Sequence, residues 1–290
     1  MIIVRLIGGL GNQMFQYALG RSISALHNTE LKFDTSYLEE KNNAHTARYY
    51  ELGAFGINAV ANDAELKPYY NIQNSRIRRR LHRNLPQWLF SHHIITEPSH
   101  AFHAEILKSP NNSLLTGFWQ TEKYFTGIEE TIRSNFKFTT PLDYKSKAIA
   151  DKINSSNSLS LHIRRGDYIA NQAANKYHGI INKEYYAKAV NLISSRHNNS
   201  HLFIFSDDIE WTKQHLQFDT PTDYIQGNNA IIDMQLMSLC KHNIIANSSF
   251  SWWGAWLNQN KNKIVIAPDK WFNKSSIDTK DVIPSNWIKL

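Results

Sequence analysis

The stretch IIVRLIGGLGNQMFQYALGRSISALHNTELKFD, residues 2–34, decides the fold of the first part of the chain. Residues 2–7 form a short apolar run typical of a buried strand, and the glycines that follow predict a tight turn. From 12 to 26 the apolar side chains recur at helical spacing, and residues 31–34 predict a second strand. Strand, glycine turn, helix and strand make a βαβ unit, which indicates an α/β fold.

The second half of the chain shows the same alternation more clearly. We expect strands at 159–163, 201–205, 243–246 and 263–267, and helices at 183–196, 211–216, 231–239 and 250–257. Strands that alternate with helices in this way favour a doubly wound parallel sheet.

The domain boundary is expected in or near residues 139–157, which contain a proline break, a charged helix and a polar turn. A length of 290 residues favours two domains or one large one. We divide the chain into an N-terminal domain, 1–148, and a C-terminal domain, 149–290. Between 40 and 140 few clean periods occur, so only helices and loops without defined ends are expected there.

Composition limits the class of protein. With 42% hydrophobic and 20% charged residues, the chain can bury a substantial core, which excludes a disordered or fibrous protein. Its one cysteine excludes an intramolecular disulfide framework. No apolar run is long enough to span a membrane and no signal-peptide pattern occurs, so we expect a cytoplasmic location. The net charge of +7 favours an anionic partner: nucleic acid, a membrane surface or a phosphorylated small molecule.

The strongest candidate site follows the expected strand at 159–163, where the sequence continues as HIRRGDY, residues 162–168. Arginine carries a planar fork of donors that can bind a phosphate through two hydrogen bonds. We expect one of Arg164 and Arg165 to face a ligand while the other pairs with Asp167. A structural salt bridge at the strand end is the alternative interpretation.

Two other strand ends carry polar side chains, and ligands bind at the carboxyl ends of strands in such a sheet. Ser206-Asp207-Asp208 follows the strand at 201–205, and its acids suit helix capping and ligand contact equally well. The stretch NSSFSWWG, residues 247–254, places hydroxyl groups where a helix begins, and helix N-termini attract phosphate. For its two tryptophans we favour core packing.

The glycine loop after the first strand has its own alternative. Gly9-Leu10-Gly11 resembles the start of the dinucleotide fingerprint G-x-G-x-x-G, and Asp34 lies near the position of a ribose-binding acid. Met14 stands in place of the third glycine, which argues against a nicotinamide oxidoreductase. The remaining interpretation is a polar loop that faces a cleft.

An arginine-rich segment occurs at 76–83, with five arginines in eight residues. Apolar side chains lie nearby at roughly helical spacing: Leu81, Leu85, Trp88 and Leu89. Pro86 is expected to break or kink a helix there. A basic amphipathic segment with a tryptophan can lie on an anionic membrane, and a solvated helix face is the ordinary alternative. No recognised nucleic-acid module accompanies it, so no nucleic-acid partner is expected.

These segments together resemble the bacterial α-1,2-fucosyltransferases of glycosyltransferase family 11, over nearly the whole chain. The resemblance rests on IGGLGNQMFQY at 7–17, HIRRGDY at 162–168, FSDD at 205–208 and NSSFSWWG at 247–254. The arginine motif alone is shared with α-1,6- and protein O-fucosyltransferases. The resemblance implies a GT-B-like α/β fold, with two Rossmann-type domains facing across a cleft. It also implies GDP-β-L-fucose as co-substrate, inversion at the anomeric carbon and no metal cofactor. The lack of an Asp-x-Asp sequence agrees with metal independence.

The resemblance also assigns roles to single residues. Arg164 would hold the β-phosphate of GDP, and Arg165 and Asp167 would support its loop. Apart from the resemblance, Asp167 is our candidate general base, and the alternatives are its commitment to Arg165 and transfer without a protein base. The other donor-binding residues implied are Gly9, Gly11 and Asn12 in the first domain, and His162, Asp207, Asp233, Ser248, Ser249 and Phe250 in the second.

The activity implied is transfer of L-fucose to the 2-hydroxyl of a terminal β-galactose. The expected setting is synthesis of O-antigen or a related surface glycan, on a lipid-linked acceptor at the inner membrane face. Acceptor specificity is expected to lie in residues 35–125. A fucosyltransferase of another linkage and a non-catalytic protein that binds a GDP-sugar or a glycan are the alternatives.

Overall fold

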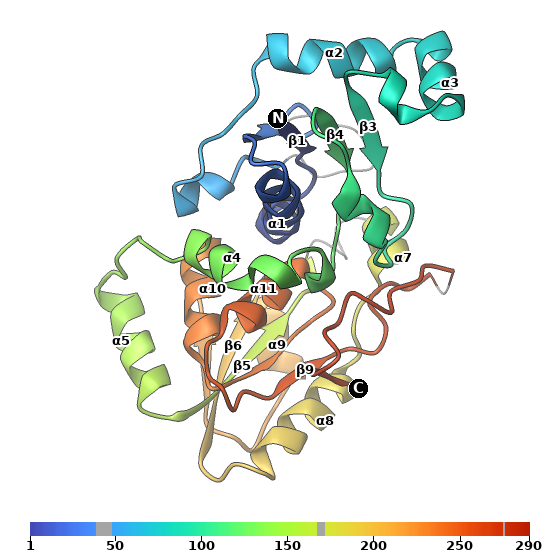
Figure 1. Ribbon diagram of the computed structural model, residues 1–290. Helices are drawn as coiled ribbons and strands as arrows, with labels where there is room; N and C mark the ends of the chain where they lie inside the picture. Colours follow the sequence, from blue (N-terminus) through green and yellow to red (C-terminus); the bar gives the residue numbers. More distant parts are fainter. Residues whose placement is uncertain (39–47, 167–171, 275) are drawn as a thin grey trace. The chain divides into compact units, whose positions relative to one another are not determined.

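The computed structural model describes residues 1–38, 48–166, 172–274 and 276–290 (Figure 1). These residues form two compact units. The first unit contains Met1–Lys137 and Lys280–Val282, and the second contains Phe138–Thr279 and Ile283–Leu290. The units divide ahead of helix α5 (Tyr144–Asn154), inside which the boundary drawn from the sequence at 148 lies. A parallel sheet organises each unit.

The sheet of the first unit has the order β2-β1-β4-β3, and all its described pairings are parallel. Its strands are β1 (Ile2–Arg5), β2 (Leu31–Asp34), β3 (His93–Thr96) and β4 (Ser113–Thr116). Helix α1 (Leu10–Leu26) connects β1 to β2, which confirms the βαβ unit expected at 2–34. The strand predicted to reach residue 7 ends at Arg5, before the turn that Gly8 makes with φ +84°.

The rest of the first unit consists of short helices and single turns. They are α2 (Asp63–Gln73), α3 (Arg76–Asn84), α4 (Glu129–Asn135), η1 (Leu52–Phe55), η2 (Gln87–Leu89), η3 (Ala104–Lys108), η4 (Glu122–Tyr124) and η5 (Thr126–Ile128). Helix α2 begins with a capping box between Asn62 and Glu65. Helix α3 ends because Leu85 is extended ahead of Pro86, so the predicted break is confirmed.

The second unit confirms the doubly wound parallel sheet, in the order β10-β9-β8-β5-β6-β7. Its strands are β5 (Asn157–Ile163), β6 (Ser200–Ser206), β7 (Thr222–Ile225), β8 (His242–Ile244), β9 (Val265–Ala267) and β10 (Ile288–Lys289). Its helices, besides α5, are α7 (Gln172–His178), α8 (Lys183–Ser194), α9 (Ile209–His215), α10 (Ala230–Leu239) and α11 (Ser249–Leu257).

Helices cover both faces of this sheet, because neighbouring residues of a strand point to opposite sides. Leu202 and Ile204 of β6 pack into the same core cluster as Val190 of α8. Phe203 and Phe205 pack on the other side, in a cluster with α5 and α10. Trp252 and Trp253 of α11 are fully buried, so the interpretation as core residues is confirmed.

Candidate active site

The site lies where the strand order of the second unit reverses. From β5 the chain proceeds through β6 to β7 on one side, and then returns to build β8, β9 and β10 on the other. Ligands of doubly wound sheets bind at the carboxyl ends of the strands at such a reversal. Strand β5 leads into Arg164 and Arg165, and β8 leads into Asn247 and Ser248. The fold therefore brings the two strongest sequence motifs to one edge of one sheet.

Both arginines after β5 are held by aspartates after β6. The Nε of Arg164 lies 3.2 Å from Oδ2 of Asp207, and Nη1 of Arg165 lies 2.7 Å from Oδ2 of Asp208. The guanidinium of Arg165 also lies 4.2 Å from the ring centre of Trp211. Arg164 and Arg165 are 26% and 22% exposed, so both can still meet solvent or a ligand.

Asp207 also fixes the backbone of the arginine loop. Its Oδ1 accepts hydrogen bonds from the backbone N–H groups of Arg165 at 2.9 Å and of Gly166 at 3.0 Å. A Cβ at Gly166 would lie 3.3 Å from the carbonyl oxygen of Asp207, so the two loops pass tightly. A carboxylate with these partners orients Arg164 and would repel a phosphate, so its geometry suits a positioning residue.

Two other acidic residues were predicted near the arginines, Asp208 and Asp167, and the structure describes only Asp208. Asp208 is the N-cap of α9, and its Oδ1 accepts from the N–H of Trp211 at 3.3 Å. The capping interpretation is therefore confirmed for Asp208. Asp167 lies outside the described residues, so its pairing with Arg165 and its role as a base remain predictions. The described partner of Arg165 is Asp208, which lies 43 positions along the chain.

His162 is a buried residue of β5, just before the arginines. Burial, followed by the nearby charge of Arg164, lowers the pKa of His162 well below its usual value, so the ring is neutral at pH 7. Its Nδ1 has no hydrogen-bond partner among the described residues. The ring centre lies 5.6 Å from that of Phe250, so the structure brings these two predicted site residues together.

Helix α11 presents its N-terminus after β8. Ser248 is the N-cap in an extended conformation, and its side chain accepts no hydrogen bond from the first turn. No acidic residue lies in that turn. The positive end of the helix dipole and its N–H groups are therefore not neutralised by a cap, which is the arrangement that binds anions. Ser249 and Phe250, both partly exposed, form this first turn.

Asp233 lies in the first turn of another helix, α10. Burial raises the pKa of Asp233 to about 6, although a hydrogen bond of 2.9 Å from Nδ2 of Asn228 opposes the shift. A carboxyl group with this pKa changes charge close to neutral pH, which is typical of functional sites.

The predicted residues of the first unit gather at the carboxyl end of β1. Gly9 is the N-cap of α1 and Gly11 is buried in its first turn. Oδ1 of Asn12 accepts from Nε2 of Gln120 at 2.8 Å, which joins the glycine loop to the segment after β4. The Gln16 amide strengthens the same junction, donating to the carbonyl of Gly117 at 3.0 Å.

A strained turn beside this junction was missed from the sequence. Trp119 is fully buried with φ +59°, a left-handed conformation that is rare for a bulky residue. The carboxylate of Glu97 stabilises the turn by accepting from the N–H groups of Phe118 at 2.7 Å and Trp119 at 2.8 Å. Burial raises the pKa of Glu97. The sequence does not predict this turn, because Glu97 forms no local motif with its hydrogen-bond partners, which lie 21 and 22 residues away along the chain.

Asp34 does not fit the dinucleotide interpretation. Its side chain is fully buried and Oδ2 lies 2.7 Å from Nε of Arg5. A carboxylate committed to a buried ion pair is not available to a ribose, which adds to the argument from Met14 against a nicotinamide enzyme.

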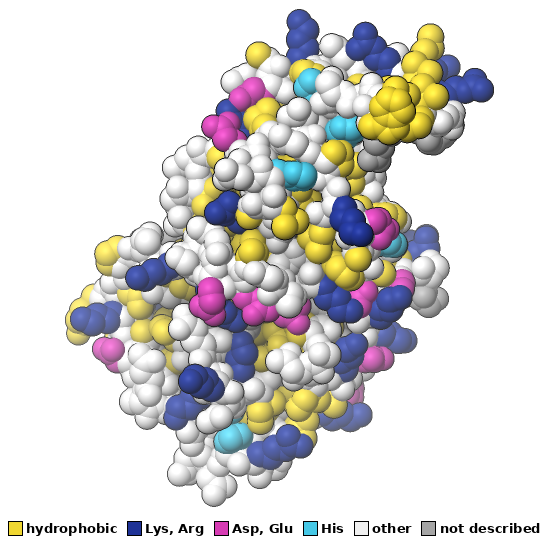
Figure 2. All heavy atoms as spheres, viewed as in Figure 1, with side chains coloured by type: hydrophobic (Ala, Val, Ile, Leu, Met, Phe, Trp, Pro, Cys, Tyr) yellow, Lys and Arg dark blue, Asp and Glu magenta, His cyan; other side chains and the backbone are white. Residues whose placement is uncertain are grey.

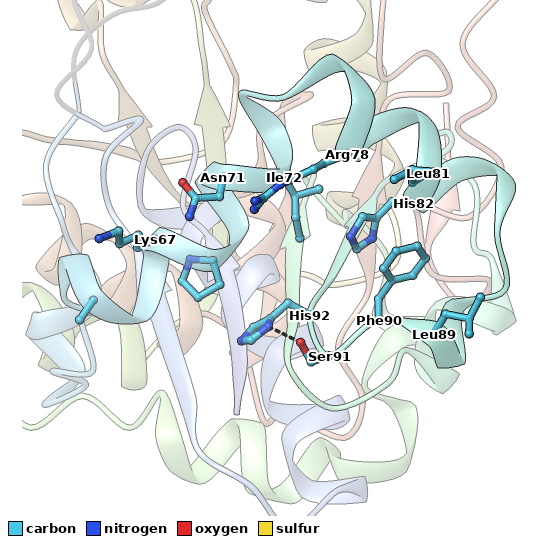
Figure 3. Close-up of a pocket in the computed structure, with 12 residues that line it drawn as sticks. Lys67, Asn71, Ile72, Arg78, Leu81, His82, Leu89, Phe90, Ser91 and His92 are labelled. Carbon is cyan, nitrogen blue, oxygen red and sulfur yellow. Dashed lines mark hydrogen bonds between the residues drawn. The ribbon is translucent and has the colours of Figure 1, made fainter.

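Two cavities occur away from the arginine loop. One of about 540 Å³ lies in the first unit, between α2 and the segment 78–92, and no predicted donor-site residue lines it (Figure 3). The other, of about 360 Å³, lies beside the ends of β8 and β9, and Asn247 and Lys270 are among its lining residues.

Within the described part of the chain, no group of three or more His, Cys, Asp or Glu side chains could hold a metal ion. No helix among the same residues is long and apolar enough to cross a membrane.

Known proteins resemble this chain over its whole length. A sequence profile described as Glycosyl transferase family 11 matches residues 1–290. An α-1,2-colitosyltransferase of Escherichia coli is 37% identical over 299 residues, covering 100% of this chain and 99% of that protein. The O-antigen biosynthesis glycosyltransferase WbnK of Escherichia coli is 34% identical over 310 residues, covering 98% and 99% of the two chains.

A solved structure supports the fold. A mutant of Arabidopsis thaliana FUT1 in complex with GDP has a TM-score of 0.52 and 9% identity, and the match covers 92% of this chain and 70% of that one. Together with the parallel sheets of both units, this likeness fits a GT-B-like fold. The resemblance found from the sequence motifs is confirmed: the chain is a glycosyltransferase and belongs to glycosyltransferase family 11.

Proposed function

We propose that the protein transfers L-fucose from GDP-β-L-fucose to the 2-hydroxyl of a terminal β-galactose, with inversion and without a metal. The observation that carries this proposal is Arg164, held by Asp207 at the strand reversal of the second unit. The uncapped N-terminus of α11, after the neighbouring strand, adds a second group suited to a diphosphate. The α-1,2 linkage in the name of the 37% identical relative supports the regiochemistry.

The proposed chemistry follows the movement of charge. The galactose 2-hydroxyl oxygen bonds to the anomeric carbon from the face opposite the diphosphate. The bond from that carbon to the phosphate oxygen breaks, and GDP leaves with the electron pair. The hydroxyl proton passes to a base, for which Asp167 is our candidate. The negative charge that grows on the diphosphate is stabilised by Arg164 more strongly in the transition state than in the ground state.

The nucleoside end of the donor fits other residues. A carboxylate can accept hydrogen bonds from the N1–H and the amino group of guanine, so we assign Asp233 to the base. Its pKa of about 6 makes this contact dependent on pH. His162, neutral and next to Phe250, suits an uncharged part of the nucleotide rather than the phosphates.

The first unit is assigned to the acceptor side. We propose that Gly9, Gly11 and Asn12 contact the donor across a cleft between the two domains, and that this unit also binds the galactoside, through residues other than the exposed side chains of α3 and η2. Surface glycan synthesis, O-antigen in particular, is supported by the description of WbnK, whose length the chain matches.

A second donor is favoured by one specific observation, because the 37% identical relative is described as a colitosyltransferase. Colitose differs from fucose by lacking the 3-hydroxyl. A pocket that hydrogen-bonds that hydroxyl would reject GDP-colitose, whereas an apolar pocket would discriminate weakly against GDP-fucose.

The test is incubation of the purified protein with lactose and EDTA, and with either GDP-fucose or GDP-colitose, followed by mass spectrometry and NMR of the product. An α-1,2-linked fucosyllactose formed faster than the colitosyl product supports the proposal, including metal independence. Faster colitosyl transfer selects the second donor. GDP binding without transfer to lactose, Galβ1,3-GalNAc or Galβ1,3-GlcNAc would favour the non-catalytic alternative.

A further inference from the structure

The arginine-rich segment is the most one-sidedly charged part of the molecule. Residues 66–96 contain Lys67 and five arginines, whereas none of the 25 acidic residues of the chain falls there. The arginines therefore lack acids on their own segment to pair with. No ion pair involves Arg76, Arg78, Arg79 or Arg80 among the described residues.

Helix α3 has an inner and an outer face. Arg78, Leu81 and His82 line the cavity of about 540 Å³, opposite Lys67 and Ile72 of α2 (Figure 3). Four other residues of the helix do not line the cavity and are all exposed: Arg76, Ile77, Arg79 and Arg80. Arg76, Arg79 and Arg80 form the outer, basic face, and Ile77, at the edge of that face one turn before Leu81, is 74% exposed.

Apolar exposure continues beyond the helix. Leu85 is 43% exposed and Trp88, in η2, is 82% exposed. Yellow hydrophobic side chains gather with dark blue Lys and Arg side chains at the α3 end of the first unit (Figure 2). A tryptophan, an isoleucine and a leucine exposed within residues 77–88, beside the arginines, are typical of an interaction surface.

We propose that α3 and η2 lie on the surface of an anionic phospholipid bilayer. Ile77, Leu85 and Trp88 would enter the interface, and Arg76, Arg79 and Arg80 would contact lipid phosphates. Arginine and tryptophan are the side chains that favour this boundary, and a short amphipathic segment can bind there without crossing. The docking itself does not depend on the donor or the acceptor. If the proposed function holds, it would bring the enzyme to a lipid-linked acceptor.

The exposed apolar residues favour a bilayer over a nucleic acid. Phosphate contacts by arginine suit both partners, but burial of isoleucine and leucine gains free energy only in the bilayer interface. The salt dependence of binding is thus expected for both, whereas a requirement for the apolar residues separates them.

The test is flotation of the full-length protein with vesicles of phosphatidylcholine alone, or of phosphatidylcholine with about 30% of the anionic lipid phosphatidylglycerol. Two variants avoid the residues that line the cavity: R79Q/R80Q and W88A. Their matched controls are K188Q/R196Q, which removes two exposed charges in the second unit, and Y144A, which removes an aromatic side chain that is 92% exposed.

We expect binding to the anionic vesicles only. Each arginine near such a surface contributes about fivefold to the partition coefficient, so R79Q/R80Q should bind roughly 25-fold more weakly. W88A should bind about tenfold more weakly, and both controls should bind like the wild type. Turnover of a soluble galactoside by R79Q/R80Q and W88A should equal that of the wild type, so loss of docking and failure of the transfer reaction are read separately.

Three results would overturn the proposal: equal binding to both kinds of vesicle, anionic binding that R79Q/R80Q leaves unchanged, or equal weakening by K188Q/R196Q. Displacement of the vesicles by a short oligonucleotide, together with full binding of W88A, would instead assign the surface to nucleic acid.

Discussion

Two pairs of adjacent arginines occupy opposite environments in this protein. Arg164 and Arg165 follow a buried strand, and each is held by an aspartate at 3.2 Å or less. Arg79 and Arg80 lie on the exposed outer face of α3, in a segment without acids. The same side chain is oriented by an ion pair in the first case and exposed without one among the described residues in the second. A fixed guanidinium can act on one bond of one ligand, whereas exposed arginines attract any anionic surface.

The largest effect is expected at Arg164. Replacement by Lys keeps the charge but removes the planar fork, so turnover at saturating donor should fall about 10²–10³-fold, as for the loss of a transition-state donor. R79K makes the same change in the exposed pair and should leave turnover unchanged. Steady-state kinetics with GDP-fucose measures both. Turnover of R164K within twofold of the wild type would refute the fixed role.

The next largest effect is expected from replacing Asp207, which holds Arg164 in place. D207N keeps the shape of the side chain but weakens its bonds to Arg164 and to two backbone N–H groups, so kcat/KM should fall roughly 10- to 100-fold through misplacement. D208N is the matched control, because it affects Arg165 and the cap of α9. It should cost about 1 kcal/mol of unfolding free energy and less than threefold in kcat/KM. Equal kinetic losses in both variants would show that the loop as a whole matters, not the orientation of Arg164.

A smaller effect is expected from Asp233 as the pH changes. With a pKa of about 6 in the free protein, Asp233 should make GDP affinity rise about tenfold between pH 5 and pH 7 if its ionised carboxylate accepts from guanine as we propose. In the absence of GDP, the folded protein holds the Asp233 proton more tightly than the unfolded chain does. Asp233 therefore makes the free protein less stable as the pH rises from about 4 to about 6. D233N should therefore bind GDP weakly at every pH, yet unfold at a higher temperature at pH 7. A wild-type affinity that does not change with pH would separate Asp233 from the base.

The smallest expected effect is on the stability of the protein when the exposed pair, Arg79 and Arg80, is replaced. R79Q/R80Q should change the free energy of unfolding by less than about 0.5 kcal/mol, because neither side chain has an ion-pair partner among the described residues. The sign should be stabilising at low salt, since like charges are removed, and the difference should vanish at high salt. Thermal unfolding at two salt concentrations measures it. A loss above 1 kcal/mol would mean that α3 depends on these arginines for its structure.

The sequence predicted the second unit better than the first for a physical reason. Strands β5 and β6 have seven residues each and are buried on both faces, so their apolar runs stand out. Strand β3 has one buried residue in four, and β10 has two residues in all, so neither gives an apolar run. Edge strand β7 was missed because only one of its residues is buried.

The sequence predicted which motifs form the site, but it did not predict which acidic side chains pair with the arginines. HIRRGDY marked the arginines, because a buried strand that ends in two charges is unusual. The partners of those arginines are set by the parallel pairing of β5 with β6, which places Asp207 and Asp208 beside them from more than 40 residues away. The left-handed conformation of Trp119 had no signal in the sequence, because Glu97, which accepts from its N–H, lies 22 residues away.

The most direct test of the account is calorimetric titration of GDP into three proteins: the wild type, R164K and R79K. We expect R164K to bind GDP at least tenfold more weakly than the wild type and R79K to bind equally well, because in the proposed site only the arginine fixed by Asp207 meets the diphosphate. Equal affinity of R164K and the wild type, or equal weakening by R79K, would contradict it.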